Sequence, residues 1–200
     1  MGLGIHYTLE LPGTTPAREA REILIRLHDA AMQMPVERVS HVVAPSLRSL
    51  LRGPPPEDLE RHFHRAAALN LYEVDVALER VEDRGRRAAV GFAVHPGRGC
   101  SAAAFGLMRP GLTAAPKDFD SDRPWYCWRW SAGCETQYAS IVSIQHLIQC
   151  HLALIHLLDE AARLGVAVTV CDQTEYWDTR SVQHLLQEVD RANGMMARLI

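Results

Sequence analysis

The most apolar stretch of the chain, residues 141–164, constrains the fold more than any other feature. Its apolar side chains recur at helical spacing, and the glycine directly after it is typical of a helix end. The polar side chains that interrupt it, each costly in lipid, are Gln145, His146, Gln149, His151 and His156. We therefore expect a helix buried in protein and no membrane span, and such a helix needs a second layer to cover it.

The start of the chain has the pattern of a strand. Apolar and polar residues alternate over residues 5–11, as expected for a strand with one face buried. A helical pattern follows over residues 16–34, and residues 36–44 again favour a strand. The opening is therefore predicted to be β-α-β, and the length of its crossover would permit a parallel pairing of the two strands.

A meander of four strands is predicted in the middle of the chain. Alternating residues on both sides of a turn at residues 83–85 predict a hairpin formed by residues 72–79 and 88–95. Two further strands are predicted at residues 105–109 and 125–131, separated by a loop rich in proline and aspartate. Strands that follow one another in this way pair antiparallel.

The remaining elements complete a single domain. A strand at residues 166–171 and an amphipathic helix from about Thr179 close the chain. Together the elements predict an α+β fold, in which a mixed, largely antiparallel β-sheet has its principal helices packed on one face. The run Pro54-Pro55-Pro56 marks a surface loop, so residues 45–70 are predicted to be a surface insertion within one domain spanning residues 1–200.

Charge and cysteine content narrow the class of partner. The chain has 21 basic and 24 acidic residues, a net charge of −3, which argues against a dedicated binder of nucleic acid or of anionic membranes. The N-terminus lacks the pattern of a secretory signal, and the 5 cysteines, without close pairs, favour free thiols in a cytoplasmic protein. Neither C-x-x-C nor H-E-x-x-H spacing is present, so we expect no metal and no other cofactor.

The segment with the most candidate binding residues is aromatic. Three of the 4 tryptophans lie within residues 125–130, and on a strand two of them would share a face with which a planar ligand could stack. Packing in the core is the alternative explanation for these tryptophans.

Loop 96–100 is a second candidate binding segment. It has two glycines and an arginine and could bind an anion, although a tight turn also explains this sequence. The predicted ligand-binding residues are Arg98, Trp128, Trp130, Gln137, Tyr138, Trp177 and Arg180.

A catalytic triad is a second candidate site. Cys134 is expected in a loop before the long helix, where helix N–H groups could lower the pKa of its thiol. His151 lies on the apolar face of that helix and could act as the base, and Asp172 at the end of the last strand could orient it. A buried structural cysteine and a satisfied core histidine are the alternative.

Several short motifs resemble those of a known protein family. They are Pro96-Gly97-Arg98-Gly99-Cys100, Cys134-Glu135-Thr136-Gln137-Tyr138-Ala139-Ser140, His151-Leu152 with Leu157-Leu158-Asp159, and Tyr176-Trp177 with Arg180 and Glu188-Val189. Together they cover most of the chain and resemble a family of uncharacterised bacterial proteins of about this length. The resemblance implies a shared fold and the same cluster of loops. The family has no assigned activity, so the resemblance implies no catalytic residue.

Three functions remain open from the sequence. The first is a cytoplasmic binding or protein-interaction module, with a pocket built from loops around Trp128 and Cys134 and an unknown small molecule or protein as partner. The second is a cysteine-dependent hydrolase or transferase that uses Cys134 and His151. The third is a structural subunit of a homodimer. A hydrogen-bonded cysteine–histidine pair would favour the second, whereas a cleft or recognition surface without such a pair would favour the first.

Overall fold

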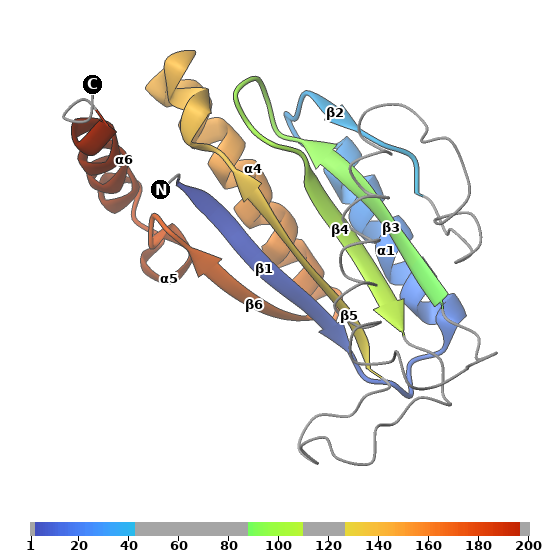
Figure 1. Cartoon of the computed structure of the whole chain (residues 1–200). Helices are drawn as coiled ribbons and strands as arrows, with labels where there is room; N and C mark the ends of the chain where they lie inside the picture. Colours follow the sequence, from blue (N-terminus) through green and yellow to red (C-terminus); the bar gives the residue numbers. More distant parts are fainter. Residues whose placement is uncertain (1–2, 43–87, 110–126, 197–200) are drawn as a thin grey trace, which may run out of the picture.

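The computed structural model describes residues 3–42, 88–109 and 127–196 of the chain (Figure 1). Its strands are β1 (Gly4–Leu11), β2 (Arg38–Val39), β3 (Ala88–His95), β4 (Ala103–Arg109), β5 (Trp128–Glu135) and β6 (Ala167–Asp172). Its helices are α1 (Ala17–Met32), η1 (Gln137–Ile141), α4 (Ile144–Arg163), α5 (Tyr176–Thr179) and α6 (Val182–Met196). Within these residues the strands form a 6-stranded sheet in the order β2-β3-β4-β5-β1-β6, and the neighbouring strands pair antiparallel.

The two long helices cover the same face of the sheet (Figure 1). Helix α1 packs against β3 and β4, and α4 packs against α1 and β6. Helix α6 adds Leu185 and Val189 to the same hydrophobic core. This arrangement confirms the predicted α+β fold, with a largely antiparallel sheet and its principal helices on one face.

The alternating sequence of β1 decides which face each side chain occupies. Ile5 and Leu9 are buried toward the helices, whereas His6 between them is exposed on the opposite face. Strand β4 differs, because its residues from Ala103 to Met108 are all buried and it is therefore covered on both faces. The part of the sheet that remains open on the side away from the helices is formed by β5, β1 and β6.

The two strands on either side of α1 do not pair with each other. β1 lies between β5 and β6, whereas β2 is the opposite edge strand and pairs with β3. The parallel pairing that the crossover length would permit is therefore not formed. The chain instead uses α1 to cross β3 and β4 before it reaches the far edge, and the hydrogen-bonding positions beside β1 are occupied by antiparallel neighbours.

Side chains help to join β4 to β5. The carbonyl oxygen of Ala104 accepts hydrogen bonds from the Tyr7 hydroxyl at 2.9 Å and from Trp130 Nε1 at 2.8 Å. A Cβ atom on Gly106 would lie 2.9 Å from the Trp130 ring, so the indole packs directly on the backbone of β4. The tryptophan thus fills the core and also satisfies a buried backbone carbonyl.

Element boundaries differ from the sequence prediction around β5 and α4. Strand β5 begins at Trp128 and continues to Glu135. The helix predicted at residues 141–164 is α4, which begins three residues later, at Ile144, and the short helix η1 precedes it. The Ser143 side chain caps α4 by accepting a hydrogen bond from the His146 N–H at 3.0 Å. The predicted insertion at 45–70 and the predicted strand at 72–79 lie outside the described residues. Among the described helices, none combines the length and apolar character needed to cross a bilayer.

Candidate functional site

One end of the molecule gathers three segments that the sequence analysis singled out. Loop 96–100, which joins β3 to β4, lies against the end of β5 and the first turn of α4. The Ser101 N–H donates to the Glu135 carbonyl at 2.9 Å, and the Glu135 N–H donates to Ser101 Oγ at 2.8 Å. His146 Nε2 lies 3.0 Å from the Arg98 carbonyl oxygen. These contacts hold the loop and the helix in one fixed arrangement.

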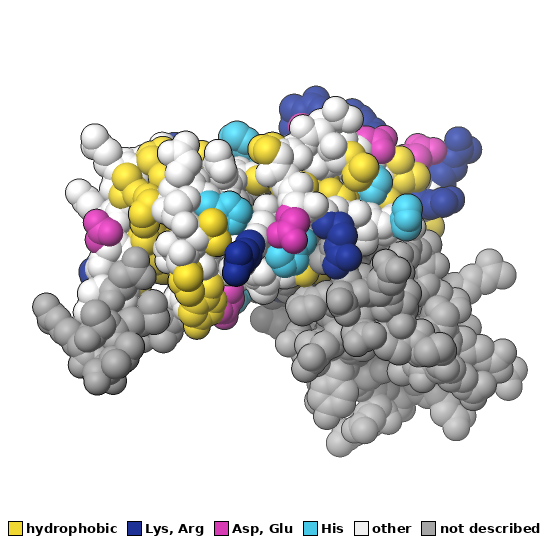
Figure 2. All heavy atoms as spheres, turned by 90° about the horizontal axis from the view of Figure 1, so that it is seen from above, with side chains coloured by type: hydrophobic (Ala, Val, Ile, Leu, Met, Phe, Trp, Pro, Cys, Tyr) yellow, Lys and Arg dark blue, Asp and Glu magenta, His cyan; other side chains and the backbone are white. Residues whose placement is uncertain are grey.

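Beyond this framework the chain exposes a group of hydrophobic side chains. We call Tyr138, Ile141, Val142 and Ile144 the end patch, and their exposed fractions are 48%, 81%, 49% and 39%. Figure 2 shows the molecule from above, which is the end where α6 and the start of α4 lie in Figure 1. Hydrophobic side chains gather there on the side of these two helices. Arg98, at the tip of loop 96–100, is also exposed. Among the predicted binding residues, Arg98 and Tyr138 therefore lie at the surface of this end.

Three other predicted binding residues lie in the interior. Trp128 and Trp130 are each 1% exposed, and Trp128 Nε1 donates to the Thr15 carbonyl at 2.9 Å. Gln137 is buried, and its Oε1 accepts a hydrogen bond from the Leu3 N–H at 2.8 Å. Their side chains hold the core and the first strand together, and the structure does not place them at a surface where a ligand could stack on them.

Cys134 occupies a strand, and the prediction that it lies in a loop is wrong. β5 continues through Cys134 because Glu135 still pairs with Gly4 of β1. The thiol is 1% exposed and donates to the Ser101 carbonyl at 2.9 Å. Burial raises the pKa of this thiol to about 12. Its hydrogen-bond partners are backbone carbonyls, and His151 has other partners.

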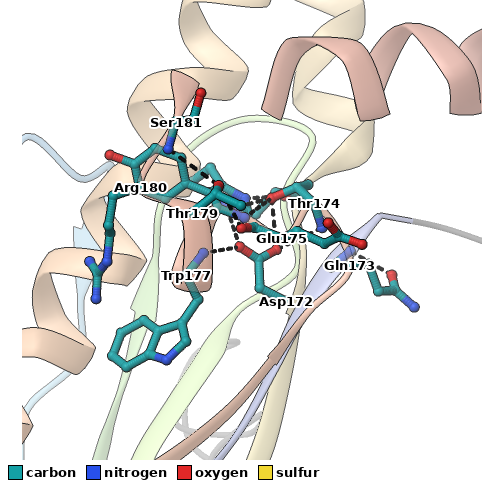
Figure 3. A network of polar contacts seen from close by, with 12 residues as sticks. Asp172, Gln173, Thr174, Glu175, Trp177, Thr179, Arg180 and Ser181 are labelled. Atoms are coloured by element: carbon teal, nitrogen blue, oxygen red, sulfur yellow. Dashed lines mark hydrogen bonds and ion pairs between the residues drawn. The ribbon is translucent and has the colours of Figure 1, made fainter. Parts of the chain in front are cut away.

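His151 and Asp172 do lie together, in a closed polar network. His151 Nε2 lies 3.2 Å from Asp172 Oδ2, and both side chains are fully buried. The other ring nitrogen of His151 lies 3.4 Å from the Thr136 hydroxyl. The Thr174 N–H donates to Asp172 Oδ1 at 2.9 Å, and the Trp177 N–H donates to Oδ2 at 2.9 Å (Figure 3). Asp172 thereby fixes the loop between β6 and α5.

The hydrogen bonds of Asp172 also control its ionisation. Burial alone would raise the pKa of this carboxyl, but the hydrogen bond and electrostatic attraction of His151 and the donors of Thr174 outweigh it. The net effect lowers the pKa to about 2. Asp172 is therefore a carboxylate at neutral pH, which suits it to hold the loop and the imidazole ring in place.

Trp177 and Arg180 form a separate corner next to this network. The Arg180 guanidinium binds both carboxylate oxygens of Asp159, at 2.7 and 2.8 Å, and lies 4.4 Å from the centre of the Trp177 ring. Glu175 and Arg180, on either side of α5, have positive φ angles of 54° and 53°. The ion pair between Arg180 and Asp159 joins the end of α5 to α4.

A shallow hollow lies on the open face of β5, β1 and β6. Its volume is about 350 Å³, and a hydrogen bond of 2.9 Å between the Thr8 and Ser131 hydroxyls crosses its floor. The side chains of His6, Thr169 and the exposed Cys171 also line it. The hollow belongs to a different face from the end patch.

Sequence reasoning missed one further cluster. His146 and Cys150 lie one turn apart on α4, and Cys150 Sγ is 3.6 Å from His146 Nε2. The i, i+4 spacing of these residues was the available signal, because it places both side chains on one face of a helix. The third member, Cys100, comes from loop 96–100 and could not be paired with them from spacing. Within the described residues, no group of three or more potential ligands is arranged to hold a metal ion.

We predict that Cys134 is inert toward alkylation in the folded protein. At pH 8 the rate at which iodoacetamide modifies Cys134 should be at least about a hundredfold lower than the rate for the exposed Cys171. Only a thiolate reacts, and Cys134 is buried and protonated. Peptide mass spectrometry after timed labelling measures both rates. In urea the two thiols should react alike, and equal rates in the native protein would contradict the assignment of Cys134 as a structural residue.

Comparison with protein-family models, with curated proteins and with solved structures finds no match to this chain.

Proposed function

We propose that this protein is a protein-interaction module whose recognition surface is the end patch together with Arg98. The observation that carries the proposal is the exposure of four large hydrophobic side chains within seven residues of sequence, on one end of the fold. Single exposed hydrophobic residues are ordinary, but a contiguous group is typical of a binding site for another protein.

The framework beneath the end patch supports this proposal. Ser101, Glu135, Arg98 and His146 hold the loop and the start of α4 together through backbone and side-chain hydrogen bonds. The patch is therefore presented by a fixed surface, so little conformational entropy is lost when a partner binds. An arginine beside an apolar centre is also common in protein interfaces.

These features define the chemistry of the partner. It should offer an apolar surface to the end patch and a carboxylate within reach of the Arg98 guanidinium. Cys100, Cys134, Cys150 and Cys171 are free thiols, which supports a further proposal that the protein works in a reducing compartment such as the cytoplasm.

Photo-crosslinking in the native cells tests the proposal. A photoreactive amino acid at position 142 should crosslink to a specific partner, and Ile141→Asp in the same chain should reduce that crosslink at least about tenfold. Ile25→Asp is the matched control, because Ile25 is a 36% exposed isoleucine on α1, outside the patch. Both variants should keep the wild-type melting temperature within a few degrees.

The outcome also separates the partner classes. Sedimentation of the purified protein shows whether a second copy occupies the patch: a dimer that Ile141→Asp dissociates would make the protein a homodimer subunit. Crosslinks from position 142 that are no stronger than those from a probe at position 22 on α1 would refute the interaction proposal.

A further inference from the structure

Cys100, Cys150 and His146 form a cluster beneath the turn that starts loop 96–100. Cys150 Sγ lies 3.6 Å from His146 Nε2, and the same nitrogen lies 3.0 Å from the Arg98 carbonyl oxygen. The Cys100 N–H donates to the Gly97 carbonyl at 3.0 Å, which closes a turn between Cys100 and the glycine that lies against α4. The thiols of Cys100 and Cys150 are near enough to shift the pKa of each other. The thiol and the imidazole on α4 are thus in contact, and the loop places a second thiol close to them.

A glycine makes this arrangement possible. A Cβ atom at Gly97 would lie 2.7 Å from Cys150 Sγ and 2.7 Å from His146 Cε1. Both side chains therefore lie directly against the backbone of the loop, where any larger residue would displace them. The cluster is a built feature of this loop and helix.

The two thiols have different acidities. The neighbouring Cys100 thiol and His146 lower the pKa of Cys150, against the opposing effects of burial and of Glu37. The neighbouring Cys150 thiol, together with burial, raises the pKa of Cys100. Cys150, beside the imidazole, is therefore more readily ionised than Cys100. Cys150 is the nucleophile of the pair and Cys100 is the protonated partner.

We propose that Cys150 and Cys100 are a redox-active dithiol that reduces a hydroperoxide and closes to an intramolecular disulfide. The Cys150 thiolate attacks one peroxide oxygen, the O–O bond breaks, and the departing hydroxide takes a proton to become water. The Cys100 sulfur then attacks the sulfenic acid of Cys150, the S–O bond breaks, and the hydroxyl leaves as water with the Cys100 proton. Two thiols and one hydrogen peroxide give one disulfide and two waters, and a low-molecular-weight thiol can reduce the disulfide again.

Burial limits which oxidants reach the pair. Cys150 is 2% exposed and Cys100 is 9% exposed, whereas His146 beside them is only partly buried. Hydrogen peroxide, which is close to water in size, fits this restriction better than a bulky disulfide oxidant. The reaction requires no protein partner, so it can succeed or fail independently of the interaction proposed above.

Stoichiometric hydrogen peroxide at pH 7 tests the proposal in the purified reduced protein. Non-reducing digestion and mass spectrometry should find Cys100 linked to Cys150; trypsin is combined with chymotrypsin because Cys134 and Cys150 share one tryptic peptide. The second-order rate of peroxide consumption should fall about tenfold in Cys150→Ser, because the thiolate is the form that attacks the peroxide and Cys150 is the more readily ionised of the two thiols. In Cys100→Ser, Cys150 should remain as a sulfenic acid that dimedone traps.

Two further variants keep the result interpretable. Cys171→Ser removes an exposed thiol outside the cluster and should leave the rate unchanged. His146→Gln should slow the reaction and raise the pH at which Cys150 is half-alkylated by iodoacetamide, a shift that mere loss of packing would not produce. A disulfide that involves Cys134, or oxidation of Cys171 before Cys150, would overturn the assignment.

Discussion

Asp172→Ala is expected to lower the free energy of unfolding by about 3–5 kcal/mol. The carboxylate accepts hydrogen bonds from the N–H groups of Thr174 and Trp177 and from the Thr174 hydroxyl, and it contacts His151. Its removal leaves several buried donors without an acceptor, and each unsatisfied group costs about 1–3 kcal/mol. Urea unfolding followed by circular dichroism measures the change.

A matched control separates this buried network from an ordinary ion pair. Asp159→Ala removes the partner of Arg180, but both side chains are about half exposed, so the expected cost is below about 1 kcal/mol. If the alanine variant of Asp172 does not fold, Asp172→Asn keeps the shape of the side chain and should show a smaller loss. Similar losses in the Asp159 and Asp172 variants would mean that the network does not stabilise the β6–α5 loop.

The dependence of stability on pH gives a second readout of the same carboxylate. The pKa of Asp172 is about 2 in the folded protein, below its ordinary value of 3.8. Such a group stabilises the folded state above about pH 4, and the contribution is lost as the pH falls from about 4 toward 2. Between pH 6 and pH 3 the wild type should therefore lose about 1 kcal/mol more stability than Asp172→Asn. Parallel curves for the two proteins would contradict the lowered pKa.

Gly99→Ala is expected to destabilise the protein by about 3 kcal/mol, through two separate costs. Gly99 has a φ of +86°, which is strained for any residue with a side chain. A Cβ atom there would also overlap the carbonyl group of Tyr138, which is backbone and cannot rotate away. The substitution should displace loop 96–100 from η1, beneath the end patch.

Gly165→Ala isolates the first of these costs. Gly165 has a similar φ of +88°, but a Cβ atom there would meet nothing within 4 Å. Its replacement should cost only about 1 kcal/mol, the penalty for the backbone conformation alone. The difference between the two variants, measured by urea unfolding, reports the close approach of the loop to η1. If both variants lose the same stability, the close approach contributes nothing.

Much of the fold could be predicted from the sequence because the relevant signals are local. Alternation in residues 5–11 fixed the buried face of β1, and the helical spacing of apolar residues fixed the faces of α1 and α4. The candidate site was less accessible to such reasoning. Cys134 was misplaced because the pairing of Glu135 with Gly4 extends β5, and that contact joins residues at opposite ends of the sequence.

The fold class, the principal helices and strands, and the buried face of each can be predicted from the sequence, because each depends on the periodicity of neighbouring residues. Tertiary structure is needed to establish the strand order, which separates β1 from β2, and the grouping of Cys100 with His146 and Cys150. It also decided that Trp128 and Trp130 lie in the core. These outcomes depend on packing and hydrogen bonds between distant segments, and local periodicity does not encode which segments meet.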